Sequence, residues 1–263
     1  MSLGPMLAAL LAQAGLESLT NWASNLAIHG ATEAEIELDL YNQPAFKNRF
    51  KAIEARRQAG MSPISINDYL NFEASTKAMA ATIGMPLDQN EIDSFLINDV
   101  SAKEVDDRMQ IAAQAAMSDT NTRSWLMSNF DISAGQIMKY WMDPKKEYPV
   151  LEQQFRMGLI GGAASRTGFG TINTSQAQRL ASIGMEQDAA ASGFANLAHM
   201  ASLFTPISGS EQSFTTDDQI SLLTGDQEVT KAVEQQQRGR QAEFAGGGSY
   251  AAGQEGFSTG TAK

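Results

Sequence analysis

The sequence predicts an all-α protein, a multi-helix globular bundle of about ten to twelve short helices with a C-terminal helix and a flexible Gly-rich tail. Three observations lead to this prediction. Apolar residues recur at helical spacing along most of the chain. Pairs of residues that typically cap helix starts precede many of these runs. Long alternation of apolar and polar residues and Asn-Gly hairpin turns are absent, so strand signals are nearly lacking.

The first helices are indicated by their start and stop residues. Pro5 suits a first helical turn and Gly15 suits a helix end. A second apolar run at helical spacing extends from Leu16 to Leu26, and Gly30 ends it. A basic helix is then expected from Phe46 to Gln58.

Later helix starts are indicated by an oxygen acceptor with an acidic or amide side chain three residues on. Such a pair satisfies backbone N–H groups that the first helical turn leaves free. The pairs are Thr32 with Glu35, Asp88 with Glu91, Ser101 with Glu104, Ser133 with Gln136, Asn173 with Gln176, and Thr216 with Gln219.

Composition changes near the C-terminus and divides the chain into four parts. These are a helical body (1–207), a polar linker (208–216), a C-terminal helix (217–244) and a Gly/Ser/Ala-rich tail (245–263). Such a tail buries too little apolar surface to order itself. The isolated Phe244, Tyr250 and Phe257 are either anchors onto a partner or incidental aromatics in a disordered end.

Charge and cysteine content exclude several function classes. The 263-residue chain has no cysteine, so disulfides and thiol catalysis are excluded, and its net charge is −11. A polyanionic partner would be repelled, so we expect no sequence-specific nucleic-acid binding. No apolar run reaches the roughly 18 residues that a membrane span requires.

The sequence offers no recognisable catalytic, cofactor or metal motif. His29 and His199 each lack a second ligand at metal-binding spacing, so both are interpreted as structural. Glu73 and Glu152 are carboxylates of the kind that glycoside hydrolases use, but nothing separates them from ordinary surface residues. The glycine-rich segment 158–170 lacks a Gly-Lys-Ser/Thr ending and favours close helix packing over phosphate binding. We therefore expect a non-enzymatic protein without a cofactor.

One cluster of cations stands out in an otherwise acidic chain. It comprises Lys47, Arg49, Lys51, Arg56 and Arg57, all within the expected basic helix. Two interpretations remain open: a solvated helix face, or a docking surface for an acidic partner.

Several blocks of the sequence, in order, resemble a family of virion-associated proteins of tailed double-stranded-DNA bacteriophages, commonly labelled minor tail, tail-assembly or internal virion proteins. Specificity comes from the order of the blocks. The chain departs from the family pattern at Gln235–Gln237, where more arginine is expected, which weakens any DNA-facing role of that helix. The blocks are Leu40–Phe50, Glu54–Gly60, Ser65 to Glu73, Asn98–Glu104, Tyr140–Pro144, Ala163–Gly170 and Arg238–Phe244.

The resemblance implies a structural protein of the virion, docked near the tail or portal axis and assisting assembly or genome delivery. Its partners would be portal, adaptor or tail components, and several copies would form a homo-oligomer in the particle. It implies no catalytic residues. Alternatives are an ejected, membrane-active protein that helps DNA to cross the host envelope, a helical scaffold or chaperone, and a wall hydrolase.

Overall fold

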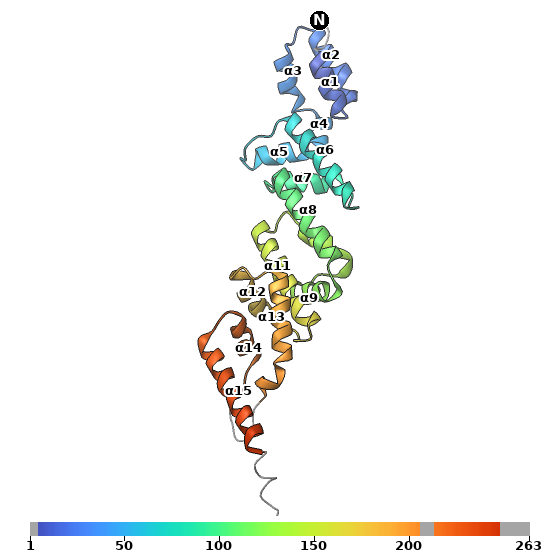
Figure 1. The fold of residues 1–263 in the computed structure, drawn as a ribbon. Helices are drawn as coiled ribbons and strands as arrows, with labels where there is room; N and C mark the ends of the chain where they lie inside the picture. The colour runs from blue at the N-terminus through green and yellow to red at the C-terminus, as the bar shows by residue number, and fades with distance from the viewer. Residues whose placement is uncertain (1–4, 206–212, 248–263) are drawn as a thin grey trace, which may run out of the picture. The chain divides into compact units, whose positions relative to one another are not determined.

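The protein is seen in a computed structural model that describes residues 5–205 and 213–247 (Figure 1). About 74% of the chain is helical, and the described residues form fifteen α-helices and no strand. The all-α prediction is therefore confirmed. Most of the predicted linker and almost all of the predicted tail lie outside the described residues.

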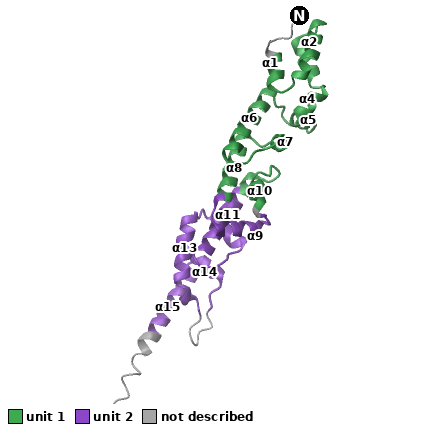
Figure 2. Cartoon of the chain, turned by 90° about the vertical axis from the view of Figure 1, so that its right-hand side faces the viewer, with its two compact units in different colours: residues 1–116, 135–151 green, residues 117–134, 152–263 purple. Residues whose placement is uncertain are grey.

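The chain forms two compact units (Figure 2). The first comprises residues 1–116 and 135–151, and the second comprises residues 117–134 and 152–263. The sequence predicted a single helical body over residues 1–207, whereas the second unit takes in residues on both sides of the predicted linker.

The first unit contains most of the short helices and the first residues of α11. Its helices are α1 (Pro5–Gln13), α2 (Thr20–Ile28), α3 (Glu33–Leu40), α4 (Pro44–Arg49), α5 (Lys51–Gln58), α6 (Ile66–Thr82), α7 (Gln89–Ile97), α8 (Ala102–Met117) and α10 (Ile137–Trp141), with short 3₁₀ turns at Glu17–Leu19 and Ala134–Gln136.

The second unit holds the remaining helices. They are α9 (Thr120–Phe130), most of α11 (Tyr148–Arg166), α12 (Thr174–Ser182), α13 (Gln187–His199), α14 (Thr216–Leu223) and α15 (Gln227–Gly247), with a 3₁₀ turn at Ala201–Phe204.

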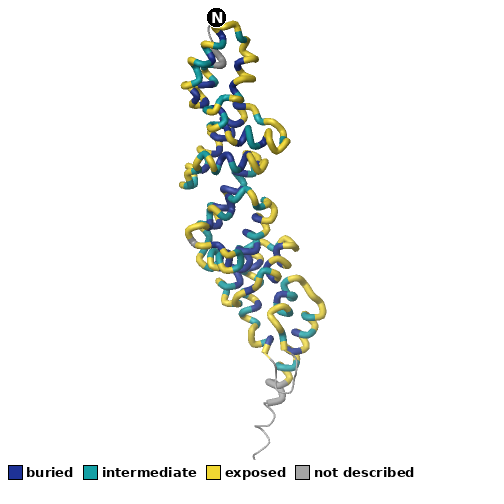
Figure 3. Tube along the Cα trace, turned by 180° about the vertical axis from the view of Figure 1, so that it is seen from behind, coloured by how far each residue is buried: buried dark blue, intermediate teal, exposed yellow. Residues whose placement is uncertain are grey.

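An aromatic series forms part of the core of the first unit. Successive ring centroids lie 4.9 Å apart for Tyr41 and Phe46, 4.8 Å apart for Phe46 and Phe50, and 4.8 Å apart for Phe50 and Tyr69. Aromatic pairs at such distances add to the stability gained by burying their area. Buried positions recur along the helices of each unit (Figure 3), as expected for helices too short to be stable alone.

Three of the six predicted capping pairs form reciprocal boxes, and in a further pair the Glu104 N–H donates to Ser101 Oγ at 3.1 Å. Reciprocal capping boxes join Thr32 with Glu35, Asp88 with Glu91, and Asn173 with Gln176. The fourth box differs from the prediction by one residue. Thr215, rather than Thr216, adopts the extended backbone of an N-cap, and the Asp218 carboxylate accepts from its backbone N–H.

Two predicted helices are each divided in the structure. The basic helix from Phe46 to Gln58 breaks at Phe50, which leaves helical geometry (φ −117°, ψ 51°) and is completely buried. The C-terminal helix predicted over 217–244 is two helices, α14 and α15. Gly225 turns the chain at φ +76°, where glycine is favoured, and the Asp226 carboxylate then accepts from the Glu228 N–H.

In the second unit, glycines allow α11 to pack closely against α9. A Cβ atom added at Gly162 would lie 2.2 Å from Thr122 Oγ1 and 2.5 Å from Thr122 Cα. A Cβ atom at Gly161 would lie 2.4 Å from the Trp125 ring, and one at Gly158 would lie 2.3 Å from Leu126. The glycine-rich segment therefore serves close helix packing, as its sequence suggested.

We expect Gly162→Ala to lower the free energy of unfolding by about 1 to 3 kcal/mol, because the methyl group collides with the backbone of α9. Urea denaturation followed by circular dichroism at 222 nm measures this change. Gly135→Ala is the control, because a Cβ atom there meets nothing within 4 Å. An alanine within a helix is ordinarily favourable, so a Gly162→Ala protein as stable as the wild type would contradict the packing described here.

Candidate functional site

The predicted basic patch is not a single outward surface, because Arg56 points into the first unit. Its side chain is buried, and Nη1 donates to the Leu96 carbonyl at 2.6 Å. Nε and Nη2 each donate to the Ser62 carbonyl at 3.2 Å, and Nη1 lies 2.7 Å from the Asp99 carboxylate. All of these partners are fixed parts of the fold, so Arg56 does not belong to a docking surface.

Arg49 is also used within the first unit. Its Nε donates to the Ala14 carbonyl at 3.0 Å, and its Nη2 forms an ion pair with Glu73. The guanidinium lies over the rings of Phe50 and Tyr69, at 5.0 and 5.5 Å from their centroids. These contacts combine charge pairing with cation–π attraction.

The other cations of the predicted patch are at least partly accessible. Arg57 is exposed and pairs with Glu54 three residues earlier, at 2.8 Å. Lys51 is exposed and Lys47 is half-buried. The predicted patch is not one surface because a helix with cations around its circumference turns some of them inward. There they donate hydrogen bonds to carbonyl groups.

Arg108 of α8 is a second buried arginine of the first unit that donates to backbone carbonyls, as Arg56 does. It is 1% exposed and donates to the carbonyls of Asp143 at 2.8 Å and Lys146 at 2.6 Å. Glu104, one turn earlier, accepts from its Nη2 at 2.7 Å. The pattern of one carboxylate and two backbone carbonyls around a guanidinium occupies most of its donors.

A polar cluster joins α6 and α7 inside the first unit. Tyr69 donates its hydroxyl hydrogen to Asp93, and the Gln89 amide donates to the Tyr69 oxygen at 2.6 Å. Burial, followed by the hydrogen bond to Asp93, raises the pKa of Tyr69. The phenol therefore stays protonated and keeps the carboxylate bonded.

Glu73 occupies the neighbouring turn of α6 and is 8% exposed. Burial by itself would raise its pKa, but hydrogen bonds from Lys77 and Arg49 outweigh burial and hold the pKa below its usual value. Glu152, the other carboxylate considered for acid–base chemistry, is exposed in the second unit and pairs with Arg156 at 3.3 Å. Glu73 therefore lacks the raised pKa that a general acid requires.

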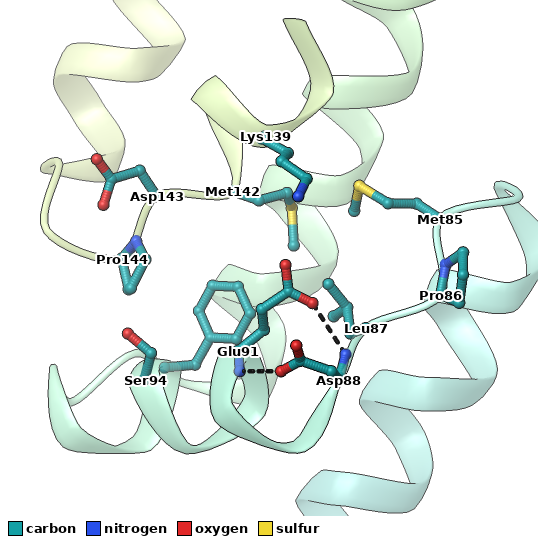
Figure 4. A pocket seen from close by; sticks show the side chains of 11 residues that line it. Met85, Pro86, Leu87, Asp88, Glu91, Ser94, Lys139, Met142, Asp143 and Pro144 are labelled. Carbon is teal, nitrogen blue, oxygen red and sulfur yellow. Dashed lines mark hydrogen bonds between the residues drawn. The ribbon is translucent and has the colours of Figure 1, made fainter. Parts of the chain in front are cut away.

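An open cavity of about 430 Å³ in the first unit was not identified from the sequence (Figure 4). It lies between the α6–α7 connection, α7, and the end of α10 with the turn that follows it. Its signal in the sequence is weak: Met85-Pro-Leu87 and Met142-Asp-Pro144 are short apolar segments at prolines, separated by more than fifty residues.

The cavity combines apolar side chains with charged ones. Its apolar lining includes Met85, Leu87, Phe95 and Met142. Asp88, Glu91 and Asp143 add carboxylates, and Lys139 extends its ammonium group toward the same space (Figure 4).

The predicted aromatic anchors are not tested by the structure. Phe244 belongs to α15, but its side chain lies outside the described residues. Tyr250 and Phe257 also lie outside the described residues. Their role as partner-binding residues stays a prediction.

The described residues form neither a metal site nor a membrane-spanning helix. Within residues 5–205 and 213–247, no three His, Asp or Glu side chains group as a metal site would require. Over the same part of the chain, no helix has both the length and the apolar character needed to cross a bilayer. Comparisons with protein-family models, curated proteins and solved structures give no match to this chain.

Neighbouring arginines provide a direct test of the buried role of Arg56. We expect Arg56→Ala to destabilise the protein by on the order of 3 kcal/mol, because the Leu96 and Ser62 carbonyls lose their charged donor. Arg57→Ala is the matched control, and its exposed ion pair contributes less than about 1 kcal/mol. Urea midpoints for the two variants measure the difference. Equal midpoints would show that Arg56 is not held as described.

The lowered pKa of Glu73 predicts a pH-dependent contribution to stability. A carboxyl with a depressed folded-state pKa stabilises above its unfolded pKa, and this contribution is lost as pH falls through the folded value. We therefore expect Glu73→Gln to be clearly less stable than the wild type at pH 7, by about 1.5 to 3 kcal/mol. The gap should shrink progressively below about pH 4.5, the unperturbed value.

Chemical denaturation across pH 3 to 7 measures this gap, because the range extends from about one unit below ordinary carboxyl pKa values to well above them. Glu152→Gln is the control, because its exposed pair should change stability by less than about 1 kcal/mol at every pH. A gap for Glu73→Gln that stays constant with pH would contradict the ionic role of this carboxylate.

Proposed function

We propose that this protein is a non-enzymatic structural component of a tailed bacteriophage particle, placed near the tail or portal axis. The observation that carries the proposal is the ordered series of sequence blocks that resembles virion-associated proteins. The series begins at Leu40–Phe50 and ends at Arg238–Phe244, so it covers most of the described chain.

The positions of the block residues support a structural role. Phe46 and Phe50 belong to the buried aromatic series, and Arg56 binds two backbone carbonyls. Trp141 is completely buried, and Ala163 lies in the part of α11 that is inaccessible to solvent. Residues in these positions determine how helices pack, so the pattern describes a fold rather than a reaction site.

In the proposed role, the partners are other virion proteins, namely portal, adaptor or tail components. Particle axes are symmetric, so the protein would be present in several copies that repeat one interface. The protein would then assist assembly or genome delivery through contacts between subunits.

Quantitative mass spectrometry of purified particles tests this proposal. We expect the protein in mature particles at a constant ratio to the portal protein, and we expect particle yield or infectivity to fall when its gene is deleted. Glu152→Gln, at an exposed ion pair of the second unit, should be incorporated at the wild-type ratio.

Two results would contradict the proposal. Protein found in assembly intermediates but missing from mature particles would make it a scaffold. Purified protein that clears peptidoglycan, and loses this activity in Glu73→Gln or Glu152→Gln while remaining folded, would make it an enzyme.

A further inference from the structure

The cavity of the first unit has an apolar lining that suits a protruding side chain. Met85 and Leu87 come from the α6–α7 connection, Phe95 comes from α7, and Met142 follows α10. Methionine side chains are flexible and polarisable, so a pocket that contains two of them adapts to differently shaped apolar groups. At about 430 Å³, the space accommodates a large apolar side chain together with part of its neighbour.

The carboxylates of the cavity are held in fixed positions. Asp88 accepts from the Glu91 N–H at 2.9 Å, and Glu91 accepts from the Asp88 N–H at 2.9 Å (Figure 4). Asp143 accepts from the Lys145 N–H at 3.0 Å. Each of these bonds uses one carboxylate oxygen, so further acceptor sites remain on every group.

The charges of the lining favour a cation. The described residues that line the cavity include three carboxylates (Asp88, Glu91 and Asp143) and a single ammonium group, that of Lys139. The Asp143 carboxylate is turned away from the centre of the cavity, whereas Asp88 and Glu91 lie beside each other at its edge (Figure 4). A cationic group that enters the cavity therefore experiences more attraction than repulsion, whereas an anionic group experiences more repulsion than attraction.

We propose that this cavity binds a segment of a partner protein in which a Leu, Met or Phe side chain adjoins a Lys or Arg. The apolar side chain enters between Met85 and Met142, and the cation contacts the carboxylates at the rim. The inference rests on the cavity alone and does not depend on a place in a virus particle.

Methyl-¹³C methionine NMR provides the test on the full-length protein. The probes are two synthetic peptides, Gly-Arg-Leu-Phe-Arg-Gly and Gly-Glu-Leu-Phe-Glu-Gly, with blocked termini. The basic peptide should give saturable shifts of the Met85 and Met142 methyl signals, which Met→Leu variants assign. Met117 is 80% exposed and does not line the cavity, so its signal should not move.

Charge variants separate this site from general attraction to an acidic protein. Glu91→Gln keeps the helix cap, since glutamine also serves in a capping box, and should weaken binding of the basic peptide about threefold. Lys139→Gln should strengthen it by a similar factor. Glu35→Gln is the matched control, because Glu35 has the same capping role in α3 outside the cavity.

A plug variant tests the apolar part of the site. Ser94 lines the cavity, so Ser94→Leu should fill it and abolish the shifts of Met85 and Met142 on adding peptide. Ser128→Leu, at an exposed position of α9, is the matched control.

Four results would overturn the proposal. Equal binding of the acidic peptide would remove the role of charge, and equal weakening by Glu35→Gln would make the attraction unspecific. Peptide binding that survives Ser94→Leu in a folded protein would place the site elsewhere. Shifts of Met85 and Met142 that depend on protein concentration without peptide would identify a second copy of this chain as the occupant.

Discussion

The fold depends on how a chain of many short helices satisfies the backbone groups at their ends. Each helix leaves its last carbonyls without partners inside the helix, and burial without a donor is costly. In the first unit, arginines from other helices supply these donors. Arg49 reaches Ala14 at the end of α1, Arg56 reaches Leu96 in the last turn of α7, and Arg108 reaches the turn before α11. A guanidinium carries several donors in a rigid plane, so one side chain can satisfy carbonyls from separate segments.

The second unit meets the same constraint with a wider choice of donors. The Trp125 indole donates to the Ile172 carbonyl at 2.8 Å, and both Gln236 and Arg240 donate to the Thr205 carbonyl. Where α9 and α11 pack, glycine removes side-chain volume and the backbones approach directly. These side chains lie where helices end or cross. Their first role is therefore to stabilise the fold rather than to bind a partner.

The sequence predicts features that depend on local spacing and misses those that depend on contacts between distant segments. Capping boxes such as Thr32 with Glu35 involve residues three apart, so their chemistry is visible in the sequence. The break at Phe50 follows packing against Tyr69, nineteen residues later, and the local pattern does not reveal it. The break at Gly225 is visible in the sequence as a glycine followed by an aspartate that can cap a helix, whereas the composition of 217–244 alone predicts one continuous helix.

The candidate site was predicted least well because a cation looks the same in sequence whether it faces solvent or a carbonyl. Buried or half-buried arginines pair with Glu73, Asp99 and Glu104, and these pairs leave little net charge at their positions. The net charge of −11 is therefore expressed mainly by carboxylates outside such pairs, including those at exposed helix starts. Helix starts hold carboxylates in fixed orientations, whereas long surface side chains do not. An acidic surface with fixed carboxylates beside an apolar cavity can discriminate among cationic partners by geometry, which a diffuse negative charge cannot do.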